Sequence, residues 1–247
     1  MATKERKEHK GKGTGAEVDG GIYLRLAARM ALDPRECIIP HTGRLIWEAD
    51  DGEYLAGRLK YYLVRVGAML GRGVDPAWEL DGVSADTAEY VELFNGNRDG
   101  WSEAVEQVWP ETTFGDMVIF DRLIVCPPFR GQELGLKCLH LLMQIIGGVT
   151  LFVMRPMPLQ YIPAYAKMPE VAKGARRKAA DVRKLVDYYK RVGFREIPGS
   201  GQMVLDPTMI NAFDQRQDLH ASLKIKRTPA LADYRLPPEV DEEADLP

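Results

Sequence analysis

Cysteine and histidine are scarce in this chain of 247 residues, and their spacing excludes several kinds of site. None of the three cysteines belongs to a Cys-x-x-Cys pair, so the sequence predicts neither a disulfide framework nor a cysteine zinc site: Cys37, Cys126 and Cys138. The four histidines also lack metal-ligand spacing: His9, His41, His140 and His220. We therefore expect no metal and a reducing compartment.

Long apolar segments are also absent. No window approaches about eighteen uninterrupted apolar residues, and the N-terminus has no apolar stretch of the kind found in a signal peptide. Gly-x-Ser-x-Gly and P-loop patterns are lacking too. These absences predict a cytoplasmic protein with no membrane partner, and they give no support to a serine hydrolase or a P-loop nucleotide enzyme.

Neither sign of charge dominates, because 33 basic and 36 acidic residues leave a formal net charge of −3. Such a balance provides no overall attraction to nucleic acid. Basic residues gather in the first twelve positions and acidic residues in the last nine. With 45% hydrophobic residues the middle can bury one core. We expect a disordered basic tail over 1–20, one folded domain over 21–206, and a C-terminal extension with an acidic tail over 207–247.

The order of apolar and turn-forming segments predicts an α/β domain. Strands are expected over 44–48, 54–70, 116–126 and 149–154. The segments 194–197 and 202–205 predict a final hairpin or one bent final strand. Helices are expected over 84–94, 101–109, 134–146 and 179–192, whereas 22–30 fits either type. The strand over 116–126, the following helix and the strand over 149–154 predict a βαβ unit.

The turn between the strand over 116–126 and the helix over 134–146 has the composition of an anion site. It places Arg130, Gly131 and Gly135 where the helix begins. The unpaired N–H groups of a first helical turn and the positive end of the helix dipole favour an anion such as a diphosphate. We call residues 130–136 the anion loop. An ordinary βα turn with the same residues is an equal alternative.

A second stretch, 188–194, ends a helix and begins a strand. Tyr189 shares a helix face with Val182 and Leu185, so its ring is expected to point toward the sheet. A buried phenol beside a departing thiolate can donate a proton. The alternative is a core tyrosine whose hydroxyl bonds to a backbone carbonyl.

Together, and in this order, the two stretches resemble the GNAT superfamily of N-acyltransferases. The acyl-CoA motif of that family is matched by the strand end Leu123-Ile124-Val125 and the loop Arg130-Gly131-Gln132-Glu133-Leu134-Gly135. Its second motif, Tyr-x-x-x-Gly-Phe, is matched by Tyr189, Gly193 and Phe194. The resemblance covers residues 116–205.

The resemblance implies a single domain with a mixed, mostly antiparallel sheet, splayed around acetyl-CoA and flanked by helices. It implies an N-acetyltransferase in which an amine attacks acetyl-CoA directly, without a metal. The pantetheine arm would lie along Leu123, Ile124 and Val125. The diphosphate would lie against the anion loop, which consists of Arg130, Gly131, Gln132, Glu133, Leu134, Gly135 and Leu136.

In this resemblance Tyr189 would protonate the CoA thiolate. Asp121, four residues before Val125, would accept the proton of the amine directly or through a water molecule. A surface ion pair between Asp121 and Arg122 is an equal alternative.

Two positions depart from the family pattern. Glu133 stands where the family usually has its first loop glycine, and Val182 where it often has asparagine. Either Glu133 turns outward or the affinity for CoA is weakened. A non-catalytic GNAT-like module that binds CoA or a protein partner is therefore the alternative function.

The sequence gives fewer indications of the residues that would bind the amine acceptor. A basic cluster before the last helix fits a solvated helix face better than a site for nucleic acid or for the 3′-phosphate of CoA: Lys173, Arg176, Arg177, Lys178, Arg183 and Lys184. The class of amine acceptor stays open, as does the oligomeric state, with a homodimer among the alternatives.

Overall fold

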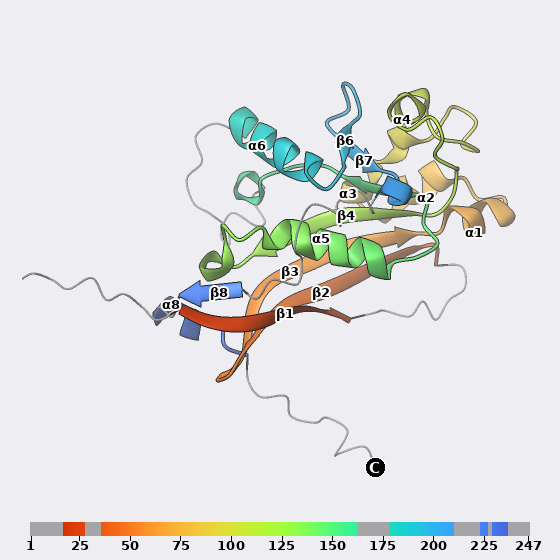
Figure 1. Cartoon of the computed structure of the whole chain (residues 1–247). Helices are drawn as coiled ribbons and strands as arrows, with labels where there is room; N and C mark the ends of the chain where they lie inside the picture. Colours follow the sequence, from red (N-terminus) through yellow and green to blue (C-terminus); the bar gives the residue numbers. More distant parts are fainter. Residues whose placement is uncertain (1–16, 28–35, 163–177, 210–222, 227–228, 237–247) are drawn as a thin grey trace, which may run out of the picture.

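The computed structural model describes residues 17–27, 36–162, 178–209, 223–226 and 229–236. Within these residues, eight strands form one sheet in the order β6-β7-β5-β4-β3-β2-β1-β8 (Figure 1). The strands are β1 Glu17–Ala27, β2 Ile38–Ala49, β3 Gly52–Val64, β4 Met117–Val125, β5 Leu151–Met154, β6 Arg195–Glu196, β7 Met203–Leu205 and β8 Leu223–Lys226. Among these described strands, β4 and β5 are the one pair that runs in parallel. The expected mixed, mostly antiparallel α/β architecture is therefore confirmed.

The helices lie around this sheet. They are α1 Val66–Gly71, α2 Pro76–Val83, α3 Ala85–Ala88, α4 Glu103–Val108, α5 Leu134–Ile145, α6 Lys178–Lys190 and α8 Pro229–Ala232, with short 3₁₀ turns η1 Val91–Leu93, η2 Pro127–Phe129, η3 Leu159–Tyr161 and η4 Pro207–Met209. Figure 1 shows α1 to α4 gathered at one end of the sheet and α6 at the other. Helix α5 connects the two parallel strands, so the predicted βαβ unit is confirmed.

Aromatic packing fixes the turn that leads into α5. Phe129, in η2, is fully buried, and its ring lies 5.8 Å from that of Trp47 on β2 in an edge-on arrangement. On β4, Phe120 stacks on Phe152 of β5 at 5.7 Å and meets Phe194 edge-on. Such aromatic pairs add to the free energy of apolar burial. The start of the anion loop is thereby tied to the core on β2.

The sheet opens between β4 and β5. Their parallel pairing runs from Met117 with Leu151 to Phe120 with Met154, yet β4 continues to Val125 while β5 ends. The sequence explains this end, because prolines stand at 156 and 158, and a proline has no N–H to give to a ladder. Beyond Phe120, β4 therefore pairs with β3 on one side and, among the described residues, with no strand on the other.

A β-bulge lies at the same point. On β3, Tyr61 is opposite Phe120 and Lys60 is opposite Arg122, so Asp121 is an extra residue on β4. A bulge bends its strand and redirects the side chain of the extra residue. Asp121 consequently lies where the opening begins.

Several predicted elements are confirmed and others are wrong. The strand over 116–126, the helix over 134–146, the helix over 179–192 and the final hairpin are confirmed as β4, α5, α6 and β6–β7. The ambiguous segment 22–30 is a strand as far as it is described, and β1 begins before the expected start of the fold at Gly21. The expected strand over 54–70 ends at Val64, where α1 follows.

Local hydrogen bonds explain the helices that the prediction misplaced. The Asp116 carboxylate accepts the N–H of Gly67 at 2.8 Å in the first turn of α1. Helix α2 was not predicted, although Asp75 caps it and Pro76 occupies its first position. The expected helix over 84–94 stops after Ala88 and continues as η1.

The C-terminal extension contributes to the sheet, which the sequence did not indicate. Strand β8 pairs with β1, from Glu17 opposite Lys226 to Gly20 opposite Leu223. This pairing joins positions about two hundred residues apart, so no local pattern reveals it. The basic residues of 1–16 and the acidic residues of 237–247 lie outside the described residues.

The close approach of β3 to β4 yields a first prediction. Gly57 lies opposite Val125, and a Cβ atom there would stand 2.6 Å from the carbonyl oxygen of Ile124. Gly57→Ala should lower the free energy of unfolding by about 1–3 kcal/mol, because backbone must move. Gly82→Ala on α2 is the control, since nothing lies within 4 Å of its added Cβ; this variant should gain up to about 1 kcal/mol. Equal urea midpoints for the two variants would contradict the close contact.

Candidate functional site

The opening between β4 and β5 forms a cleft with a volume of about 680 Å³. Residues 120–125 of β4 line one wall. Met154 at the end of β5, Arg155 and residues 157–160 line the other. The anion loop and α6 complete the cleft. The two sequence motifs, which lie about sixty residues apart, therefore meet at one cavity.

Most of the predicted site residues line this cleft. They are Asp121, Leu123, Ile124, Val125, Arg130, Gly131, Glu133, Leu134, Gly135 and Tyr189. The described lining does not include Gln132 or Leu136. The structure thus brings the predicted positions together, and their chemical roles stay predictions.

Glu133 adopts the left-handed conformation at the N-cap of α5, with φ 60° and ψ 17°. Its side chain makes no capping hydrogen bond to the helix. Instead, the carboxylate oxygen Oε1 lies 2.6 Å from Nη2 of Arg191, just after α6. The carboxylate thus links the start of α5 to the end of α6, at the edge of the cleft.

The side chain of Tyr188, which comes from α6, lies against the anion loop. Its hydroxyl oxygen accepts the N–H of Leu136 at 3.1 Å, and a Cβ on Gly135 would stand 2.9 Å from the same oxygen. Gly135 therefore provides the space for this phenol. Burial raises the pKa of Tyr188, while the Leu136 hydrogen bond opposes that rise. The prediction singled out Tyr189 and missed Tyr188, although the adjacent pair of tyrosines was a usable signal.

Tyr189 lies deeper along the same helix. Its ring lines the cleft and packs edge-on against Tyr188 at 5.5 Å and Phe194 at 6.4 Å. Burial raises the pKa of Tyr189 above the usual value of a phenol. The hydroxyl therefore keeps its proton at neutral pH, as a proton donor must.

Arg130 is exposed and lies at the Val125 end of β4, whereas Asp121 lies nearer the point where the pairing with β5 ends. Its Nε donates a hydrogen bond to the carbonyl oxygen of Val125 at 2.9 Å. This bond holds the guanidinium across the end of β4, beside the first turn of α5. A positive charge fixed there adds to the attraction that the helix N-terminus exerts on an anion.

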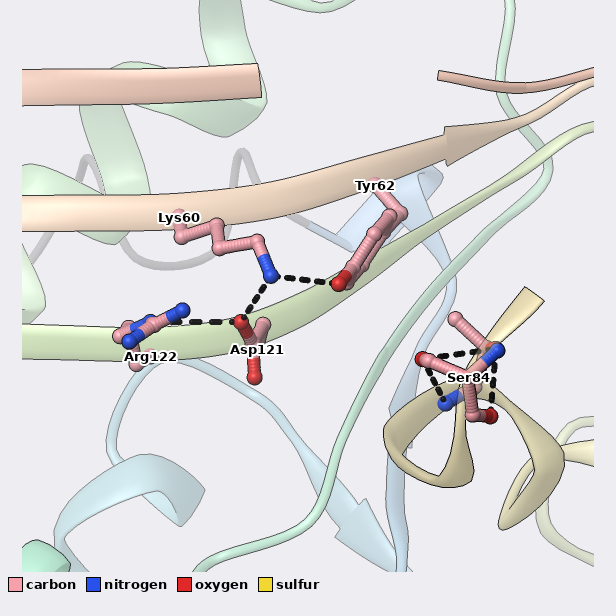
Figure 2. A network of polar contacts seen from close by, with 6 residues as sticks. Lys60, Tyr62, Ser84, Asp121 and Arg122 are labelled. Carbon is pink, nitrogen blue, oxygen red and sulfur yellow. Dashed lines mark hydrogen bonds and ion pairs between the residues drawn. The ribbon is translucent and has the colours of Figure 1, made fainter. Parts of the chain in front are cut away.

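Asp121 is the centre of a half-buried polar network (Figure 2). Its Oδ2 lies 3.0 Å from Lys60 Nζ and 3.3 Å from Arg122 Nε, and its side chain is only 11% exposed. Lys60 also donates a hydrogen bond to the hydroxyl of Tyr62. Burial lowers the pKa of Lys60, but the bonds to Tyr62 and Asp121 outweigh this effect and raise it overall. The alternative ion pair with Arg122 is therefore present, with Lys60 as an unpredicted third member.

The remaining expectations concern metals, membranes and the basic cluster. Among the described residues, no group of three His, Cys, Asp or Glu side chains is arranged to hold a metal ion. No helix in the described ranges has the length and apolar character needed to cross a membrane. In the basic cluster, Arg183 pairs with Asp187 and Glu196, and Lys184 pairs with Asp181. Three of its members lie outside the described residues: Lys173, Arg176 and Arg177.

No protein-family model, curated protein or solved structure matches the chain. The functional assignment therefore depends on the geometry of the cleft and on the residues of the two motifs.

The backbone at Glu133 yields a second prediction. A left-handed conformation costs a residue with a Cβ about 1–2 kcal/mol, and glycine adopts it freely. Glu133→Gly and Glu133→Ala both remove the partly exposed ion pair with Arg191. Only the glycine variant also removes the energetic cost of the left-handed conformation. The glycine variant should therefore be the more stable of the two by about 1 kcal/mol in urea denaturation. An alanine variant of equal or greater stability would contradict the left-handed assignment.

Proposed function

We propose that this chain is an N-acetyltransferase of the GNAT type, which moves an acetyl group from acetyl-CoA to an amine. The observation that carries the proposal is the opening between β4 and β5, at which both motif segments meet. The cleft combines an open strand edge, the N-terminus of α5 and the phenol of Tyr189, which are the features that the resemblance assigns to the acetyl-CoA site.

The donor would bind along β4 and the anion loop. From Asp121 to Val125, the strand edge that faces the cleft pairs with no strand in the described part of the chain, so its backbone groups would bind the amides of the pantetheine arm. The diphosphate would bind at the start of α5, beside Arg130. There it would share the N–H of Leu136 with the Tyr188 hydroxyl or displace that hydroxyl.

The reaction follows from these positions. The nitrogen of the amine attacks the thioester carbonyl carbon, a C–N bond forms, and the C–S bond breaks as the CoA thiolate leaves. The Tyr189 hydroxyl gives its proton to this thiolate, and Asp121 receives the proton that the amine loses, directly or through water. Proton exchange with solvent then restores both side chains. The products are an N-acetyl amide and CoA.

A non-catalytic CoA-binding module is the second candidate, and one observation favours it. The Tyr188 hydroxyl and the Glu133 carboxylate both lie at the loop that would receive the diphosphate. A module of this kind would bind acetyl-CoA weakly and would release no CoA thiol above background with any amine. A thiol-release assay across a panel of amines therefore distinguishes the two functions.

The adjacent tyrosines provide a third prediction with a matched control. Tyr189→Phe removes the proposed proton donor, so kcat should fall about 100-fold while the Kd for acetyl-CoA, measured by calorimetry, changes little. Tyr188→Phe removes a hydroxyl at the anion loop, so it should change the Kd for acetyl-CoA and leave kcat close to that of the unaltered protein.

Two results would contradict the proposal. The first is an absence of binding heat with acetyl-CoA at millimolar concentration, which would exclude acetyl-CoA as the acetyl donor. The second is an equal kcat for Tyr189→Phe and the unaltered protein. This result would show that Tyr189 does not donate the proton, although acetyl-CoA could still be a ligand.

A further inference from the structure

Asp121 differs from its neighbours on β4 because it is the extra residue of the bulge. No residue of β3 is opposite Asp121, since Tyr61 and Lys60 are already opposite its two neighbours. A bulge disrupts the ladder locally, so the strand register alone does not fix the direction of the extra side chain. Contacts of the carboxylate itself must therefore fix it.

The two oxygens of this carboxylate have different surroundings. Oδ2 lies 3.0 Å from Lys60 Nζ and 3.3 Å from Arg122 Nε, and it has almost no exposed surface. Figure 2 shows the second oxygen, Oδ1, turned away from both cations. Because Oδ2 is covered and Asp121 lines the cleft, Oδ1 is the oxygen that a ligand can reach.

Lys60 ties the carboxylate to the neighbouring strand. Arg122 follows Asp121 directly on β4 and moves with the bulge, whereas Lys60 extends from β3. Lys60 is itself held in place, because its Nζ donates a hydrogen bond to the hydroxyl of Tyr62 and lies 4.5 Å from the centre of that ring. Tyr62 is buried, and the Lys60 side chain is only 22% exposed. The ammonium group therefore gives the carboxylate a fixed partner outside β4.

Lys60 also keeps its own proton. Burial lowers the pKa of Lys60, but the contacts with Tyr62 and Asp121 raise it overall. The ammonium group is therefore charged at neutral pH and cannot receive the proton of an acceptor amine. Any effect of Lys60 on proton transfer must pass through the carboxylate that it contacts.

We infer that Lys60 is a positioning residue for the proposed acetyl transfer, because it holds Asp121 by Oδ2 so that Oδ1 faces the acceptor amine. The inference rests on the proposed function, in which Asp121 takes the proton that the amine loses. An N–H bond of the amine breaks, an O–H bond forms at Oδ1, directly or through water, and Oδ2 keeps its ion pair with Lys60. A base that a third group orients in this way is a recurring arrangement in enzymes. A displacement of the reacting groups by about 1 Å can lower a rate about 100-fold.

The experiment is a double-mutant cycle on kcat, measured by thiol release from acetyl-CoA with the fastest-reacting amine of the panel. Lys60→Met removes the ammonium group and should lower kcat about 10- to 100-fold, with little change in the Kd for acetyl-CoA. Asp121→Asn should lower kcat about 100-fold. The doubly substituted protein should have the kcat of Asp121→Asn alone, because a residue that acts through Asp121 has no effect once the carboxylate is gone. A merely structural role of Lys60 would lower kcat by the same factor in both backgrounds.

Two further variants complete the cycle. Tyr62→Phe removes the hydroxyl that holds Lys60 and changes no charge, so it tests the same arrangement if Lys60→Met does not fold. It should lower kcat about threefold to tenfold, and this loss should also disappear in the Asp121→Asn background. Arg44→Met is the control, because Arg44 is an exposed cation on β2, opposite Arg58 and so on the same face of the sheet as Lys60. It should leave kcat unchanged.

The outcomes separate this inference from the proposed function. If Lys60→Met keeps full kcat, if Asp121→Asn keeps it, or if the effects of the two substitutions multiply, the positioning role is overturned and the acetyltransferase proposal stands. If the unaltered protein binds acetyl-CoA but releases no thiol with any amine, the acetyltransferase proposal fails and the positioning role fails with it.

Discussion

The parallel pairing of β4 with β5 ends at Phe120 and Met154, and the candidate site depends on this early end. Prolines at 156 and 158 prevent the chain after β5 from continuing the ladder, while β4 stays paired with β3 as far as Val125. Among the strands that the structure describes, none therefore pairs with this part of β4 on the side of β5. Such an edge requires hydrogen-bonding partners, which a ligand with amide groups can supply.

The rest of the core holds this opening in place. Gly57 lets β3 approach β4 closely at Ile124, and Phe129 packs against Trp47 to anchor the turn before α5. The bulge at Asp121 turns a carboxylate toward the opening, where Lys60 neutralises it from the neighbouring strand. Residues of β3 thus hold β4 in place and supply one of the charges at the inner end of the cleft.

The local part of this arrangement could be predicted from the sequence, and the long-range part could not. Apolar runs ended by Pro127 and by two glycines at 147 and 148 are sufficient to indicate β4, α5 and β5. By contrast, the contact of Lys60 with Asp121 depends on a strand register that a bulge shifts by one residue. The pairing of β1 with β8 depends on contact between residues 17–20 and 223–226, which lie far apart in the sequence. Asp75 and Pro76 did carry a local signal for α2, and the prediction overlooked it.

Two groups at the anion loop are bonded to side chains of the protein itself. The Leu136 N–H bonds to Tyr188, and Glu133 pairs with Arg191, so both a donor and a cation near the loop have protein partners. An incoming diphosphate therefore exchanges partners instead of filling empty positions, and its net gain is the difference between two sets of hydrogen bonds.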